Sequence, residues 1–146
     1  MICDELMKHP VESVRPNEDV ESAARRMAAC NVGFLPVCNA GGRLIGTITD
    51  RDIAVRYVAE GLPRGTRVEQ VMTRNVVRCR PEDDVLVAEQ LMGEHHVARI
   101  VCSDDSGRPV GVISLSDVAQ CESDDRAAST LRRVTEREGP VLHYGF

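Results

Sequence analysis

Apolar positions in the first half of the chain follow two spacings, one typical of an amphipathic helix and one typical of buried strands. The helical spacing of i, i+3, i+4, i+7 and i+8 begins directly after the polar, cap-rich stretch 17–19. Two short apolar runs flank the Asn-Ala-Gly-Gly turn at 39–42 and predict a β-hairpin. The predicted elements are a strand over 11–14, a helix from Val20 to about Asn31, strands over 34–38 and 44–49, and a helix over 50–59.

The second half repeats this order of elements. Residues 7–54 align with residues 72–119 at a constant offset of 65 without a gap, and 15 of the 48 aligned pairs are identical. Two copies of one unit usually pack about a pseudo-twofold axis, so a pocket made by one copy predicts a partner pocket made by the other. The predicted elements of the second copy are a strand over 76–79, a helix from Val85, strands over 99–102 and 110–114, and a helix from Ser116.

The repeat and the chain length predict an α/β (α+β) fold of two small units that fold as one body. With 146 residues in total, each unit lies near the lower size limit for folding alone. The chain has no Trp, two Phe and two Tyr, so aliphatic side chains must make the core. We divide the chain into a first repeat (1–61), a connector (62–71), a second repeat (72–121), and a C-terminal charged helix and tail (122–146). The stretch 122–138 is expected to be helical in its later part, and the last eight residues either dock on the protein or fray.

Charge and composition exclude several classes of protein. The formal net charge of −5 argues against a nucleic-acid binder, because such proteins usually carry a basic patch. The sequence holds no run of about 18 apolar residues that could span a membrane. Its N-terminus lacks the basic-then-apolar pattern of a signal peptide. We therefore expect a cytoplasmic protein that binds neither nucleic acid nor membrane.

Six cysteines are scattered along the chain without a C-x-x-C pair. In a reducing compartment, isolated cysteines mostly act as small core hydrophobes. A metal-responsive or redox-responsive variant is the alternative, in which Cys38 and His95 approach each other across the pseudo-twofold axis, with His96 adjacent. Structural zinc usually shows close ligand pairs at fixed spacing, so we assign no metal site.

Two matched segments carry the candidate chemistry, 46–52 and 111–117. Each predicted strand ends in a hydroxyl residue, Thr49 or Ser114, and an Asp follows three residues later at the start of a helix. One interpretation is a capping box, which serves any helix start. The other is a grip on a ribose phosphate, since a helix N-terminus and a hydroxyl suit phosphate and a carboxylate suits two neighbouring sugar hydroxyls.

Further motifs accompany these segments at matching places in both copies. They are Met7-Lys-His-Pro-Val11 and Met72-Thr-Arg-Asn-Val76 at the unit starts, and Val32-Gly-Phe-Leu-Pro-Val37 in the middle of the first unit. Together with Gly-x-Ile-[Thr/Ser]-x-x-Asp, they make the repeat resemble the cystathionine β-synthase (CBS) domain. The chain resembles a stand-alone tandem pair, called a Bateman module, over about residues 3–121.

This resemblance implies two β-α-β-β-α units with clefts that bind AMP, ADP, ATP or S-adenosylmethionine. It implies that Thr49 and Ser114 contact phosphate and that Asp52 and Asp117 hold ribose. It also implies a homodimer formed through the amphipathic helices and a regulated protein that the sequence does not identify. The expected ligand-binding residues are Lys8, His9, Pro10, Val11, Phe34, Thr49, Asp50, Arg51, Asp52, Thr73, Arg74, Asn75, Val76, Arg99, Ser114 and Asp117.

The two copies differ at positions that affect phosphate binding. Arg99 stands where the first copy has Phe34, and a basic residue there often reaches the phosphate in this family. Asp50 adds a negative charge to the first copy, which disfavours phosphate unless Arg51 offsets it. We therefore expect the cleft that contains Ser114, Asp117 and Arg99 to bind phosphorylated ligands better.

No motif indicates an enzyme: the sequence holds no P-loop, no dinucleotide fingerprint and no H-E-x-x-H. A triad of Ser114, His95 or His96, and Asp117 is disfavoured, because Ser114 and Asp117 have direct counterparts in the first copy. We predict a non-enzymatic sensor of adenosine compounds without a catalytic cofactor. An interaction protein with empty clefts and the metal-responsive variant remain as alternatives.

Overall fold

The computed structural model describes residues 1–136, and the possible docking of the last eight residues lies outside the described part of the chain. The first half consists of α2 (Val20–Cys30), β1 (Phe34–Cys38), β2 (Leu44–Thr49), α3 (Asp50–Asp52) and the π-helix η1 (Ile53–Val58). The second half consists of η2 (Val68–Gln70), β3 (Arg78–Cys79), α4 (Val85–His95), β4 (Arg99–Ser103), β5 (Pro109–Ser114), α5 (Leu115–Cys121) and α6 (Asp124–Thr135). A short helix, α1 (Cys3–Leu6), precedes both halves.

Local sequence signals explain where these elements begin and end. The Asp19 side chain accepts the Ser22 N–H at 2.7 Å and caps α2, which ends at Asn31 in the left-handed conformation with φ 53°. In the first hairpin turn, the Asn39 side-chain oxygen accepts the N–H groups of Gly41 and Arg43, both at 3.0 Å. The predicted first helix and first hairpin are confirmed.

Four predicted elements differ from the structure, and two of them lie in the first copy. The strand expected over 11–14 shrinks to Val14, whose N–H donates to the Pro36 carbonyl at 3.0 Å and whose carbonyl accepts the Cys38 N–H at 2.9 Å. The helix over 50–59 starts as an α-turn and continues as a π-helix, with the Ala59 N–H bonded five residues back to Ala54.

The second copy also differs from its predicted elements, and its first strand is again shorter than predicted. Its strand over 76–79 shrinks to Arg78–Cys79. The last helix, in contrast, is longer than expected. It starts already at Asp124, because the Ser123 side chain accepts the Arg126 N–H at 3.4 Å and caps it.

The sheets are small, and each belongs to one half. β1 and β2 form an antiparallel pair, while β4 pairs antiparallel with β5 and parallel with β3. The isolated parallel bridge between Val14 and Val37 in the first half is the counterpart of the β3–β4 pairing in the second. The pseudo-symmetry read from the sequence is therefore present in the strand pairing.

The segment at the start of each repeat packs on the other repeat. Cys3 and Leu6 of α1 lie in the hydrophobic core of the second half, whereas Val68 and Val71 lie in that of the first. Lys8 bridges to β5 through N–H and carbonyl bonds of 2.9 and 3.1 Å with Val112. At the equivalent place in the repeat, residue 73 bridges to β2 in the same way. The two halves are thus joined by two symmetric crossings of the chain.

Glycine permits these crossings. A Cβ atom at Gly46 would lie 2.9 Å from the Met72 sulfur and from the Thr73 carbonyl oxygen, and one at Gly111 would collide with Met7. Such distances are too short for a real Cβ, so β2 and β5 each need a glycine where the crossing segment passes.

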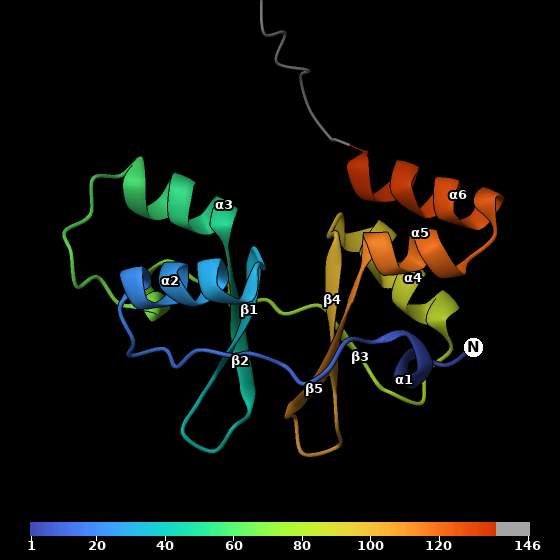
Figure 1. Cartoon of the computed structure of the whole chain (residues 1–146), viewed down its shortest axis with the longest axis horizontal. Helices are drawn as coiled ribbons and strands as arrows, with labels where there is room; N and C mark the ends of the chain where they lie inside the picture. Colours follow the sequence, from blue (N-terminus) through green and yellow to red (C-terminus); the bar gives the residue numbers. More distant parts are fainter. Residues whose placement is uncertain (137–146) are drawn as a thin grey trace, which may run out of the picture.

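In Figure 1 the strands of the two halves face each other in the middle of the molecule, and the helices lie outside them. Helix α6 lies over α4 and α5 on the second half. Its contacts include an Arg126–Glu89 ion pair of 2.9 Å and a His96 Nδ1 to Arg133 carbonyl bond of 2.9 Å. Among residues 1–136, no helix combines the length and the apolar character that crossing a bilayer requires.

Candidate functional site

The hydroxyl and carboxylate residues of the first copy form a reciprocal capping box at the end of β2. The Thr49 side chain accepts the Asp52 N–H at 3.1 Å, and Asp52 Oδ2 accepts the Thr49 N–H at 3.0 Å. The capping interpretation of this motif is therefore confirmed for the first copy.

The second copy has the same box at the end of β5. The Asp117 N–H donates to Ser114 Oγ at 3.2 Å, and Asp117 Oδ2 accepts from the Ser114 N–H at 2.8 Å and from its hydroxyl at 2.7 Å. Ser114 Oγ also lies 2.8 Å from Ser116 Oγ. One carboxylate oxygen of each Asp is thus engaged in fixing the start of the next helix.

The other carboxylate oxygen of each Asp is not held in a short hydrogen bond. Asp52 Oδ1 lies 3.7 Å from Arg56 Nε, and Asp117 Oδ1 lies 3.7 Å from Lys8 Nζ. Both distances exceed hydrogen-bond length, so these oxygens retain capacity to accept from a ligand. Capping and ligand binding are consequently compatible in the same side chain.

Each box borders a cleft between the two halves. The cleft beside Ser114, called the Ser114 cleft below, encloses about 400 Å³. Its wall combines the crossing segment of the first repeat with the ends of β1 and β5. The lining residues are Lys8, Pro10, Val11, Glu12, Cys30, Asn31, Val32, Gly33, Phe34, Leu35, Pro36, Arg99, Val112, Ser114, Ser116 and Asp117.

The corresponding cleft beside Thr49, called the Thr49 cleft below, encloses about 350 Å³. Both volumes fall within the range of about 300–1,000 Å³ that is usual for small-molecule sites. The lining residues are Phe34, Thr47, Thr49, Asp50, Arg51, Asp52, Thr73, Asn75, Val77, His96, Val97, Ala98 and Arg99. Phe34 and Arg99 line both clefts.

Most of the residues expected from the sequence line one of these clefts, and three do not. His9, Arg74 and Val76 are absent from both linings. In an extended segment, alternate side chains point to opposite sides, so 73, 75 and 77 face the Thr49 cleft while 74 and 76 face away. The same alternation would have indicated Glu12 and Val77, which the sequence reading missed.

The position of Arg99 changes the expected difference between the clefts. Because Arg99 lines both, its charge alone does not favour the Ser114 cleft. Four charged side chains still differ between the clefts: Lys8 and Glu12 line only the Ser114 cleft, and Asp50 and Arg51 line only the Thr49 cleft. The Asp50 carboxylate accepts the Arg51 N–H at 2.9 Å. The formal charges cancel within each of these pairs, so the contrast between the clefts depends on where the four side chains lie and not on a difference in net charge.

The cysteines are arranged differently from the expectation. Within residues 1–136, the one group of three possible metal ligands is Cys3, Cys79 and Cys102, and it includes neither Cys38 nor His95. Cys38 is buried on β1, and His95 is exposed at the last turn of α4. The repeat could have indicated that these three cysteines occupy core positions of one unit, since all three align with valines of the other copy at the offset of 65.

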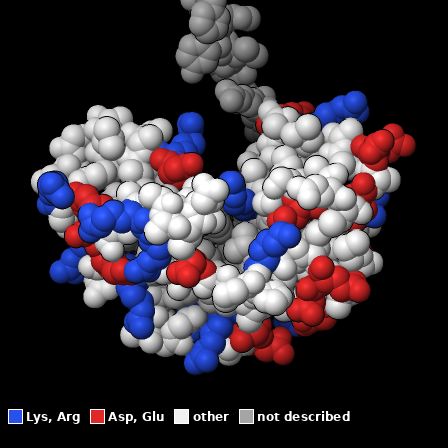
Figure 2. Space-filling model, viewed as in Figure 1, with Lys and Arg blue, Asp and Glu red and all other residues white. Residues whose placement is uncertain are grey.

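Positively and negatively charged side chains are mixed around the clefts, and neither sign forms a continuous patch there. Figure 2 shows Lys and Arg mixed with Asp and Glu over this face, which is hollowed between the two halves. A binding site here must select its ligand through a few placed groups, such as Lys8 and Arg99, and not through overall attraction.

Comparison with known proteins places this geometry in context. The CBS domain pattern matches residues 3–58 and 68–124. The CBS domain-containing protein YhcV of Bacillus subtilis is 35% identical over 134 residues, which cover 91% of this chain and 94% of YhcV. The CBS domain pair of protein MJ0100, solved with 5′-methylthioadenosine and S-adenosyl-L-methionine, is 25% identical, with a TM-score of 0.76 over 82% of this chain and 94% of that one. CBS domain protein PAE2072 of Pyrobaculum aerophilum, complexed with AMP, shares the fold at 23% identity, with a TM-score of 0.77 over 90% and 98% of the two chains.

Proposed function

This chain belongs to the CBS domain family, and from that membership we propose that it is a non-catalytic regulatory module whose two clefts bind an adenosine-containing ligand. The ligand class is AMP, ADP, ATP or S-adenosylmethionine. The single observation that carries the proposal is the duplicated pair of a helix-capping hydroxyl and an Asp with one uncommitted oxygen, each at the edge of a cleft of suitable volume.

The proposed binding mode assigns one task to each group. The free Oδ1 atoms of Asp52 and Asp117 accept hydrogen bonds from the two ribose hydroxyls, because a carboxylate is an acceptor only. The hydroxyls of Thr49 and Ser114 lie beside them and face the charged tail of the ligand. The aliphatic linings and Phe34 contact adenine. The MJ0100 pair, which holds two adenosyl compounds, supports this ligand class.

We propose further that the Ser114 cleft prefers phosphorylated ligands. Lys8 brings a cation to its rim, with a side chain that is 77% exposed and an ammonium 3.7 Å from Asp117 Oδ1, where a phosphate would compete for it. The Thr49 cleft has an uncharged Thr73 at that place, together with the charges of Asp50 and Arg51, whereas the Ser114 cleft also carries Glu12. Repulsion between a phosphate and a carboxylate acts in both clefts, so the proposed preference rests on the reach of the exposed Lys8 ammonium toward the phosphate.

Regulation would follow from the construction of the clefts. Each cleft takes side chains from both halves, so a bound ligand contacts both at once and favours the arrangement that fits it best. A regulated protein that binds this chain would then respond to the altered arrangement of the two halves.

The proposal is tested by calorimetric titration with AMP, ATP and S-adenosylmethionine, together with thermal unfolding at rising ligand concentration. Binding to the folded state must raise the melting temperature with concentration. Glu60, which is exposed and lines neither cleft, provides a Glu60→Ala control with a similar loss of charge. If none of the three compounds binds or changes the melting temperature at millimolar concentration, the proposal is wrong.

We also propose a homodimer in the cytoplasm, with the helices of the first half at its centre. Val55 and Val58 on η1 are 46% and 66% exposed, whereas α6 covers α4 and α5 of the second half. Light scattering should give twice the chain mass of 16.0 kDa, and Val58→Asp should shift it toward the monomer. A monomer at all concentrations would refute this assembly.

A further inference from the structure

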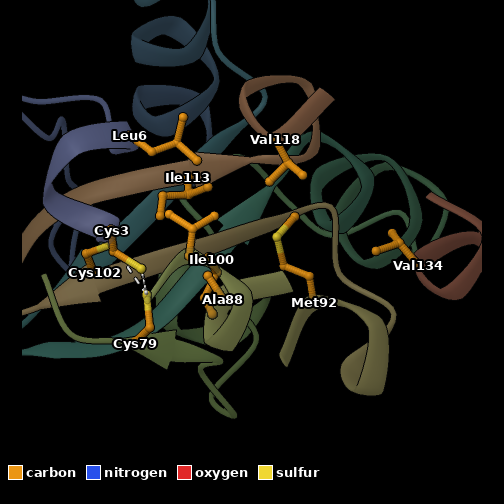
Figure 3. Close-up of a cluster of buried hydrophobic side chains, with 11 residues drawn as sticks. Cys3, Leu6, Cys79, Ala88, Met92, Ile100, Cys102, Ile113, Val118 and Val134 are labelled. Atoms are coloured by element: carbon orange, nitrogen blue, oxygen red, sulfur yellow. Dashed lines mark hydrogen bonds between the residues drawn. The ribbon is translucent and has the colours of Figure 1, made fainter. Parts of the chain in front are cut away.

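Three cysteine side chains meet in the core of the second half. Cys3 comes from α1, Cys79 from β3 and Cys102 from β4, and all three are buried. Cys79 Sγ lies 3.4 Å from Cys102 Sγ and 3.8 Å from Cys3 Sγ, and all three sulfur atoms lie within 4.8 Å of one another. Figure 3 shows the three side chains converging on one point.

The first repeat shows that packing alone does not require sulfur at these positions. At the offset of 65, the trio corresponds to Val68, Val14 and Val37, which are also buried together in the first core. Val14 and Val37 form a parallel bridge, as Cys79 and Cys102 do. The same backbone arrangement thus accepts three valines in one half and carries three thiols in the other.

The spacing of the sulfurs suits a metal ion better than a disulfide. Three thiolates around one ion at a metal–sulfur distance of about 2.3 Å are separated from each other by about 4 Å in a trigonal plane. The observed separations are close to this value. A disulfide needs a separation of about 2.0 Å, so two sulfurs would have to move together by more than 1 Å, and the third thiol would have no part.

A polar cleft borders one member of the trio. Cys79 lines a hollow of about 360 Å³ beside the two hairpin turns, at the end of the sheets away from Thr49 and Ser114. Acidic and basic side chains border it, so it is a hydrated surface next to the Cys79 side of the trio. Its lining residues are Arg43, Arg78, Cys79, Arg80, Asp83, Ser103, Asp104, Asp105 and Gly107.

We propose that Cys3, Cys79 and Cys102 form a three-thiolate site for a soft metal ion, with copper(I) as the ion that the coordination number fits. Thiolates select copper(I) and zinc among the common ions. Structural zinc takes four ligands, and within residues 1–136 no fourth His, Cys, Asp or Glu joins the group. As each copper–sulfur bond forms, the thiol releases its proton to solvent, and the copper stays in the monovalent state.

Metal binding at this place would tie the N-terminal segment to the second half. The helix that carries Cys3 continues into the crossing segment, which brings Lys8 to the Ser114 cleft. This inference does not depend on the adenosine-binding proposal, because the trio lies outside both adenosyl clefts.

The test is an anaerobic titration of the reduced full chain with copper(I) in competition with a chromophoric chelator. We expect one tightly bound copper per chain. The triple variant Cys3→Val/Cys79→Val/Cys102→Val copies the packing of the first repeat and should fold but lose that copper. The matched control Cys38→Val removes another buried thiol, outside the trio, and should bind one copper as the unchanged chain does.

X-ray absorption of the copper-loaded chain provides a measurement that needs no variant. Three sulfur neighbours at one distance support the site, whereas two or four overturn it. The proposal is equally overturned if the triple variant keeps its copper, or if zinc binds to the trio and copper(I) does not.

Discussion

Replacing Asp117 by Ala removes two functions from one side chain, and the structure separates them. Oδ2 caps α5 through the Ser114 N–H at 2.8 Å, while Oδ1 lies 3.7 Å from Lys8 Nζ, and both residues line the Ser114 cleft. Loss of a cap typically costs about 1 kcal/mol of stability. A hydrogen bond from a ligand hydroxyl to a carboxylate contributes about 1.5–3 kcal/mol, and the Asp117 side chain is only 12% exposed, so water screens it little.

We therefore expect Asp117→Ala to lower the affinity of the Ser114 cleft for AMP by about tenfold to a hundredfold. Asp117→Asn separates the two effects, because its side-chain oxygen still accepts the Ser114 N–H but carries no charge. That variant should keep most of the stability and lose much of the affinity. Asp52→Ala should act in the same way on the Thr49 cleft and leave the Ser114 cleft unchanged.

The assay is isothermal calorimetry with AMP, with urea unfolding of each variant measured in parallel. Glu60→Ala should change neither quantity. The reasoning is refuted if the double variant Asp52→Ala/Asp117→Ala remains folded and binds AMP as tightly as the unchanged chain. A loss of stability with full retention of affinity would show that both carboxylates serve only as helix caps.

Three further predictions follow from other contacts. Lys8→Ala should weaken AMP several-fold more than adenosine in paired titrations, because the ammonium acts on the phosphate; an equal loss for both ligands would contradict this. Gly111→Ala should destabilise the chain by about 1–3 kcal/mol in urea unfolding, because its Cβ collides with the crossing segment, whereas Gly41→Ala, which meets only a side-chain oxygen at 3.4 Å, should be tolerated. The Tyr57 hydroxyl donates to Glu21 and lowers the pKa of that carboxyl, so this contribution is present above the unfolded pKa and is lost as the pH falls through the folded one. In acid unfolding, Tyr57→Phe should therefore lose less stability between neutral and acid pH than the unchanged chain; an identical pH dependence would disprove the link.

The two halves differ more on their outer faces than in their clefts. Helix α6 places Arg126 and Thr130 on Glu89, a buried carboxylate whose pKa is raised by burial and lowered again by Arg126. No equivalent helix covers the first half within the described residues, which leaves Val55 and Val58 exposed. The outer face of the second half is thus covered by α6, whereas that of the first half leaves apolar side chains exposed.

The amino-acid sequence by itself determined the repeat, the long helices, the hairpins and the two capping boxes. These features arise from contacts within a few residues: Asp19 reaches the N–H three positions on, and Asn39 folds back on its own turn. The spacing of apolar positions shows which face of a helix is buried, and it needs no knowledge of what lies against that face. The fold could therefore be predicted before any coordinates, and most of the residues expected to bind a ligand do line a cleft.

Only the tertiary structure decided which segments meet across the molecule. The crossing of the N-terminal segments, the presence of Arg99 in both clefts and the meeting of Cys3 with Cys79 and Cys102 join residues far apart in the chain. Such contacts produce no periodic pattern in the sequence, because they depend on the relative orientation of the two folded units. For the same reason the predicted strand over 11–14 was wrong: Val11 and Glu12 line a cleft, and only Val14 pairs with a neighbouring strand.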